Sequence, residues 1–105
     1  MAKSRMVIQL NYEAAKRQAQ KLDEIAGTLT NVADRQLNGC FGQLQTNWKG
    51  DNANTYLNKG KVVQDDIRTT AANVKNAAES IRKIAKRTYD ADMAAVRMAE
   101  TRMSR

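Results

Sequence analysis

The side chains that most often carry out chemistry are scarce in this 105-residue sequence, which has no histidine and a single cysteine, Cys40. Zinc ligation and histidine-based proton transfer therefore lack their usual ligands and bases. Carboxylates occur singly or as neighbours, as in Asp23 with Glu24 and Asp65 with Asp66, on what helical periodicity makes a solvated face. We therefore predict no catalytic residue, no metal site and no cofactor.

Two short stretches still need an explanation. The first, Gly39-Cys40-Phe41-Gly42, follows no strand and lacks the Lys-Ser/Thr ending of a phosphate-binding loop, and Cys40 is expected to be a small buried residue. The second, Arg82 to Arg87, holds four cations within six residues and is the main argument for nucleic-acid binding. Ile84 and Ala85 within it continue an apolar face, and cations near a helix C-terminus complement the helix dipole, so we favour a structural role.

The composition predicts a single all-α domain. The chain has no proline, 5 glycines and only 5% aromatic residues, which permits long uninterrupted helices and supplies strands poorly. The net charge is +7: the residues before Trp48 include 6 basic and 4 acidic side chains, and those from Trp48 onward include 12 and 7. Such a balance favours an acidic partner, which charge alone leaves open among nucleic acid, anionic lipid and protein.

The elements that position these residues follow from hydrophobic spacing. We predict an extended lead-in over 1–10, a helix over 11–46 with Asn11 as its N-cap, a turn over 47–52, a helix over 53–91 and a tail over 92–105. Apolar residues recur every three or four positions in both helices, and a four-residue stutter after Ala33 predicts local unwinding. The core should end near Thr88, because Asp92 falls where an apolar residue is due.

The turn organises these elements. Gly50 can adopt positive φ, so the two helices should form an antiparallel hairpin with Trp48 at its tip. The apolar face is wider than one partner helix can cover, which predicts pairing of hairpins into a four-helix bundle. The residues expected at that partner interface are Leu22, Leu29, Val63, Ile67, Val74, Ile81 and Ile84.

The run NWKGDNANTYL resembles the WXG family of small ESAT-like helical hairpins, which are substrates and partner proteins of type VII secretion systems. Trp48-Lys49-Gly50 matches the Trp-x-Gly turn, Ala53 the small residue after it and Tyr56 a frequent aromatic position. The resemblance covers about residues 6–92. It implies a non-enzymatic protein that is exported folded, as a homodimer or heterodimer, by an ATPase-driven machine. Alternatively, it implies an escort that completes the N-terminal helical domain of a larger secreted toxin.

The tail departs from this family pattern. Members or their dimer partners carry a Tyr-x-x-x-Asp/Glu export signal, whereas Tyr89 is followed by Asp92 at three positions and Met93 at four. Either Tyr89 and Asp92 form a degenerate signal on one helix face, or a partner supplies the signal.

The predicted localisation is the cytoplasm before export and then secretion without a cleaved signal peptide. The apolar run from Met6 to Ile8 is too short for a signal-peptide core, and no stretch approaches membrane-spanning length. The alternative function is a basic helical nucleic-acid-binding module, and a membrane-active amphipathic hairpin is a third reading, which the interrupted apolar face disfavours.

Overall fold

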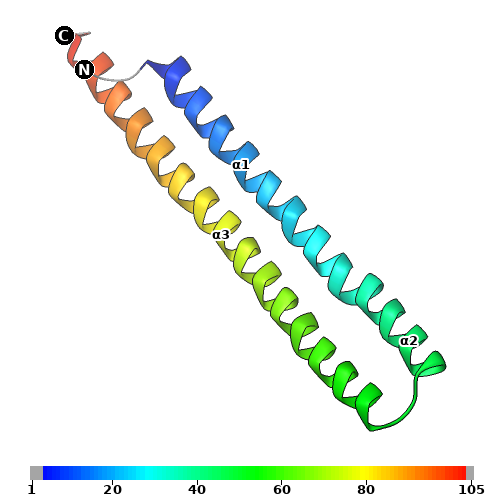
Figure 1. The fold of residues 1–105 in the computed structure, drawn as a ribbon. Helices are drawn as coiled ribbons and strands as arrows, with labels where there is room; N and C mark the ends of the chain where they lie inside the picture. Colours follow the sequence, from blue (N-terminus) through cyan, green and yellow to red (C-terminus); the bar gives the residue numbers. More distant parts are fainter. Residues whose placement is uncertain (1–3, 104–105) are drawn as a thin grey trace. The chain divides into compact units, whose positions relative to one another are not determined.

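The computed structural model describes residues 4–103, which are nearly all helical (Figure 1). Helix α1 spans Arg5–Asn31, a π-helical turn, η1, spans Val32–Leu37, α2 spans Asn38–Asn47 and α3 spans Asp51–Met103. No strand occurs among these residues, so the predicted all-α class is confirmed. Within this range no helix has both the length and the hydropathy that crossing a bilayer requires.

One compact unit, which we call the turn unit, is Asp23–Lys75. Its two helical arms lie side by side and antiparallel, because Phe41 lies against Gly60 and Asp34 pairs with Arg68 at 2.8 Å. Helical pairing on either side of the turn is therefore present within this unit.

A three-residue break, Trp48 to Gly50, joins the arms of the turn unit (Figure 1). Gly50 has φ of 116°, a conformation that costs glycine little and other residues much. The break is narrower than the predicted turn over 47–52, because α2 retains Asn47 and α3 begins at Asp51. The carbonyl of Gly50 already accepts the backbone N–H four residues later, and so starts the hydrogen-bond ladder of α3.

The inward-facing lines of the helices consist largely of alanine. At the predicted seam positions, the buried residues are Ala19, Ala26 and Ala33 before the break and Ala53, Leu57, Gln64, Ala71 and Ala78 in α3. The spacing of the seams is thus confirmed. Small side chains let helix backbones approach closely, so each unit has a thin core with few large residues.

The arm before the break is interrupted by η1, so the predicted helix over 11–46 is in fact α1, η1 and α2. The expected local unwinding after Ala33 is confirmed, since η1 covers that point. A π-helical turn pairs residues five apart and accommodates one more residue than an α-turn. Here the apolar line takes a step of four residues where a step of three is due. The π-helical turn accommodates the additional residue, so the apolar positions after it still face α3.

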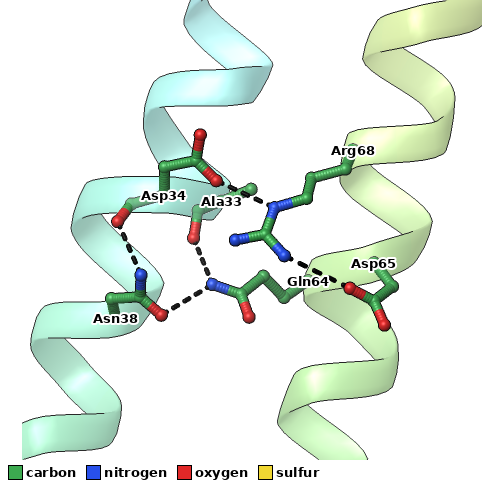
Figure 2. A network of polar contacts seen from close by, with 6 residues as sticks. All are labelled: Ala33, Asp34, Asn38, Gln64, Asp65 and Arg68. Carbon is green, nitrogen blue, oxygen red and sulfur yellow. Dashed lines mark hydrogen bonds and ion pairs between the residues drawn. The ribbon is translucent and has the colours of Figure 1, made fainter.

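A polar network lies where η1 faces α3 (Figure 2). Gln64 is only 5% exposed, and its side-chain nitrogen donates to the backbone carbonyl of Ala33 and to Oδ1 of Asn38 at 2.8 Å. Asn38 in turn donates to the carbonyl of Asp34, and Arg68 donates to the Asp34 carboxylate, both at 2.8 Å. The buried amide is thus hydrogen-bonded to Ala33 of the π-helical turn and to Asn38, the first residue of α2, as a buried polar group requires.

The second compact unit, which we call the terminal unit, combines Met1–Leu22 with Asn76–Arg105. Its two segments come from opposite ends of the chain. They run antiparallel, because Arg5 pairs with Glu100 at 2.8 Å whereas Tyr12, further along the first segment, contacts the earlier Tyr89.

The start of α1 contradicts the predicted extended lead-in over 1–10 and the predicted N-cap at Asn11. Helix α1 begins directly after Ser4, whose hydroxyl accepts the N–H of Val7 at 3.2 Å, which is N-cap geometry. Ile8 is 2% exposed and extends the inward line toward the N-terminus. The residues before Ser4, which belong to the same prediction, lie outside the described part.

The predicted end of the core near Thr88 and the predicted tail over 92–105 are also wrong for the residues described. The inward line takes an extra four-residue step from Ala85 to Tyr89 and goes on to Val96, which is 8% exposed. Such a step shifts the line by one residue relative to a heptad repeat. The prediction assumed a strict heptad repeat, which places the Asp92 carboxylate at an inward position, and it therefore ended the core before Asp92. The last two residues of the predicted tail lie outside the described part.

Candidate interaction surface

Within residues 4–103, no three His, Cys, Asp or Glu side chains are grouped so that they could hold a metal ion. Cys40 is exposed, which contradicts the expectation of a buried thiol. The inward positions after η1 are Leu37, Phe41 and Leu44, all half-buried, so Cys40 lies one residue out of phase. The residues to place are those predicted for the turn, the partner interface and the export signal.

Trp48 and Tyr56 form an aromatic pair at the break of the turn unit. Their ring centroids are 5.4 Å apart with the planes tilted by 55°. Trp48 is 39% exposed and Tyr56 65% exposed, so both rings are open to another molecule. Paired, partly exposed aromatic rings supply large contact area at low entropic cost.

The seven residues predicted for the partner interface fall into two sets. Five are half-buried in their own unit: Leu22, Leu29, Ile67, Val74 and Ile81. The other two, Val63 and Ile84, are 52% and 61% exposed and remain available to another chain. Periodicity alone treats the two sets alike, because it reports an apolar face and not how much of that face the neighbouring helix covers.

Tyr89 and Asp92, the two residues predicted as a degenerate export signal, are half-buried in the terminal unit. The Tyr89 ring packs on Tyr12, with centroids 4.7 Å apart and planes at 31°. Tyr12 was not among the predicted site residues. The sequence did contain a signal for this contact. A four-residue spacing from Ala85 puts Tyr89 on the side of α3 that faces α1.

An apolar groove of about 270 Å³ lies beside this aromatic pair in the terminal unit. It is lined by Ile8, Asn11, Tyr12 and Ala15 of α1 and by Ile81, Ile84, Ala85, Thr88, Tyr89 and Asp92 of α3. The groove brings the predicted interface residues Ile81 and Ile84 together with the predicted signal residues Tyr89 and Asp92.

Two ion pairs perturb ionisable groups of the terminal unit. Arg5 donates to both carboxylate oxygens of Glu100, at 3.0 and 2.8 Å, in the bidentate geometry that favours arginine. These hydrogen bonds lower the pKa of Glu100 and raise that of Arg5. Lys86 donates to Asp90 at 2.7 Å, and this bond raises the pKa of Lys86.

The net charge is confined to one unit. In the described residues of the terminal unit there are 10 basic and 5 acidic side chains, a net charge of +5, whereas the turn unit has 6 of each. Six cations of the terminal unit form no ion pair with the described residues: Arg17, Lys21, Lys83, Arg87, Arg97 and Arg102. The sequence alone shows an excess in the second half, but only the pairing of the chain ends collects it in one unit.

No family model matches this chain, and neither does any curated protein or solved structure. The resemblance of Trp48-Lys49-Gly50 and its surroundings to the WXG family therefore stays a prediction.

Proposed function

We propose that this chain is a non-enzymatic protein of a bacterial type VII secretion system. It is exported as a dimer, or it escorts a larger secreted toxin or effector by pairing helices with it. The observation that supports this is the break at Trp48 to Gly50 between two antiparallel helical arms, with Gly50 at φ of 116°. A Trp-x-Gly sequence at a helix reversal is the feature by which the sequence resembles the WXG family.

Exposed apolar side chains support a role in helix pairing. Val63 and Ile84 on α3, and the Trp48 and Tyr56 rings, expose apolar area that a second helical pair would remove from water. In this proposal, two helical pairs form a four-helix bundle, and the second pair is another copy or the N-terminal domain of a larger substrate. The secretion ATPase then recognises the assembled bundle.

Export by the type VII ATPase tests the function directly. A tagged chain is produced, together with its partner where a partner supplies the signal, in a bacterium that has a type VII system and in the same strain with its secretion ATPase inactivated. We expect the chain in the culture medium of the first strain only, with release of a cytoplasmic enzyme measured as the control for lysis. Equal amounts in both media would refute the proposal.

The two explanations for the tail are separated by a conservative variant. Because Tyr89 packs on Tyr12, Tyr89→Ala would disturb the fold, whereas Tyr89→Phe keeps the ring and removes only the hydroxyl. If Tyr89 and Asp92 carry a degenerate signal, Tyr89→Phe with Asp92→Asn should remain in the cell with little change in melting temperature. If a partner supplies the signal, the same variant should leave whenever that partner is co-expressed.

A basic nucleic-acid-binding module is the alternative function. The observation that favours it is the net charge of +5 on the described residues of the terminal unit, including Lys83 and Arg87 on one exposed stretch of α3. These cations would contact phosphates and not bases, so this alternative predicts binding without sequence preference.

A further inference from the structure

The groove of the terminal unit combines buried and exposed apolar side chains. Ile8 is 2% exposed, whereas Ile84, which lines the same groove of about 270 Å³, is 61% exposed. The Tyr12 and Tyr89 rings add flat aromatic area to the lining. Another apolar surface placed here would remove Ile84 and these rings from water, which is the main source of affinity between helices.

The groove borders an uncharged stripe on α3. At helical spacing from Ile84, the residues on the same side of the helix are Thr88, Ala91, Ala95 and Met98, all without charge. Asn11 lines the groove from α1, and its neighbours at helical spacing, Val7 and Ala14, are also uncharged. The stripe accepts the apolar side of another helix without burying a charge, and Asp92 is the one charged residue among those that line the groove.

Cations border this stripe. Arg87 lies three residues after Ile84, and Arg102 lies four residues after Met98, so each is next to the stripe on the helix surface. Neither forms an ion pair with the described residues, and the described residues of the unit carry a net charge of +5. A second copy of the unit would bring one net positive charge against another, whereas an acidic chain would be attracted.

We propose that this groove and the uncharged stripe beside it bind an amphipathic helix of an acidic protein. The apolar side of that helix contacts Ile84 and the tyrosine rings, and its carboxylates face Arg87 and Arg102. This inference rests on the proposed function and narrows it: the partner is a different, acidic helical chain and not a second copy. Because the charge lies in the terminal unit, that unit and not the turn unit selects the partner.

The test measures fluorescence anisotropy of labelled peptides titrated with the full chain. The acidic probe is a four-heptad helix with Leu and Ala at its a and d positions and Glu at most others, and the basic probe has Lys in place of Glu. We expect the acidic peptide to bind at least about tenfold more tightly than the basic one at low salt, with the difference shrinking at high salt. An acidic peptide with its apolar positions scrambled should bind at least about tenfold more weakly.

Matched variants locate the site. Ile84→Asn should weaken binding of the acidic peptide about tenfold, whereas Val62→Asn, at an equally exposed position of the turn unit (61% in both cases), should not. Arg87→Gln should weaken it, whereas Lys61→Gln in the turn unit should not. Circular dichroism melting of each variant separates loss of binding from loss of folding.

Several outcomes would overturn the inference: equal binding of the acidic and basic peptides, equal binding of the scrambled peptide, or equal losses in the Ile84 and Val62 variants. A homodimer by light scattering that Ile84→Asn dissociates would also overturn it, since a second copy would then occupy the groove. The peptide assay needs no secretion machinery. Peptide binding without ATPase-dependent export would therefore refute the proposed function but not the helix-binding surface. Export without peptide binding would refute the helix-binding surface but not the proposed function.

Discussion

Gly60 shows how a missing side chain determines packing at the scale of one residue. A Cβ built at Gly60 would lie 2.6 Å from Cε1 of Phe41, closer than real side chains approach, whereas one built at Gly39 would meet nothing within 4 Å. Alanine is a better helix former than glycine at either position. The two substitutions therefore share the gain in helix propensity and differ in the contact with Phe41.

We expect Gly39→Ala to raise the free energy of unfolding by roughly 0.5–1 kcal/mol. Gly60→Ala should lower it by about 1 kcal/mol, because displacing the Phe41 ring costs more than the propensity gained. Urea unfolding followed by circular dichroism measures both. In a Phe41→Leu background, Gly60→Ala should lower the free energy of unfolding less. If Gly60→Ala stabilised the wild-type chain, the Phe41 ring would have to move without an energetic cost.

Glu100 makes stability depend on pH. Its pKa is lowered from the ordinary 4.5, first by the hydrogen bonds from Arg5. A carboxylate whose pKa is lower in the folded state contributes stability that is present above its unfolded pKa and is lost as the pH falls through the folded pKa. We expect Glu100→Gln to lower the melting temperature slightly at pH 7, and the difference from wild type to vanish in acid below the lowered pKa.

The matched control for Glu100 is Glu79→Gln. Glu79 accepts a hydrogen bond from Arg82 only three residues away on the same helix and is similarly exposed, at 56% against 54% for Glu100. Local pairs of this kind contribute little. A pH-dependent effect as large for Glu79 as for Glu100 would show that general charge, and not the pairing of the chain ends, is responsible.

At the scale of elements, η1 lets two regular helical segments keep their inward faces despite an extra residue. The inward line runs from Ala33 through Leu37 to Phe41, two successive steps of four. Removing one residue between Ala33 and Leu37 would shorten the first step to three and restore the regular repeat, so that η1 could become α-helix. The same deletion within α1 would turn everything before it by about 100° relative to the core.

We therefore expect deletion of Gln36, an exposed residue of η1, to cost no more than about 1–3 kcal/mol, mainly through the altered hydrogen bonds of Gln64. Deletion of Gln20, an exposed residue of α1, should cost several times more or abolish cooperative unfolding. Helix content and thermal melting by circular dichroism distinguish the two. Equal losses would show that η1 does not absorb the extra residue.

Gln64→Leu isolates the buried amide of the same element. The substitution removes the donor to the Ala33 carbonyl and to Asn38, and leaves the carbonyl buried without that partner. We expect it to lower the free energy of unfolding by about 1–3 kcal/mol in the wild-type chain. In the Gln36 deletion the same substitution should cost less, because the carbonyl could then accept a bond within a regular α-turn. Equal losses in both backgrounds would count against this role.

At the scale of the whole molecule, the charge of the terminal unit determines any binding to nucleic acid. We expect labelled duplex DNA to bind weakly and without sequence preference, with affinity falling at least about tenfold between 50 and 200 mM salt, since only phosphate contacts contribute. Replacing Lys83 and Arg87 by Gln should weaken this binding, whereas replacing Lys59 and Lys61 should change it less. Sequence-selective binding that persists at high salt, measured by anisotropy, would make the nucleic-acid reading the leading one.

The sequence by itself determined the helical class, the alanine seams, a turn within 47–52 and the unwinding after Ala33. These are local properties: the spacing of apolar residues and the conformational freedom of Gly50 are properties of a short stretch of chain. The cap at Ser4 is local as well, and it was missed because Ser4 stands before a stretch whose apolar residues alternate instead of recurring at helical spacing.

Only the tertiary structure decided which residues are left for function. Tyr12 and Tyr89 are far apart in sequence, and their contact depends on the pairing of the chain ends, which also gathers the whole net charge into one unit. Periodicity placed Ile81 and Ile84 on one apolar face, but burial by the facing helix leaves one half-buried and the other 61% exposed. How far a neighbouring helix covers an apolar face depends on distances between segments, which a one-dimensional pattern does not contain.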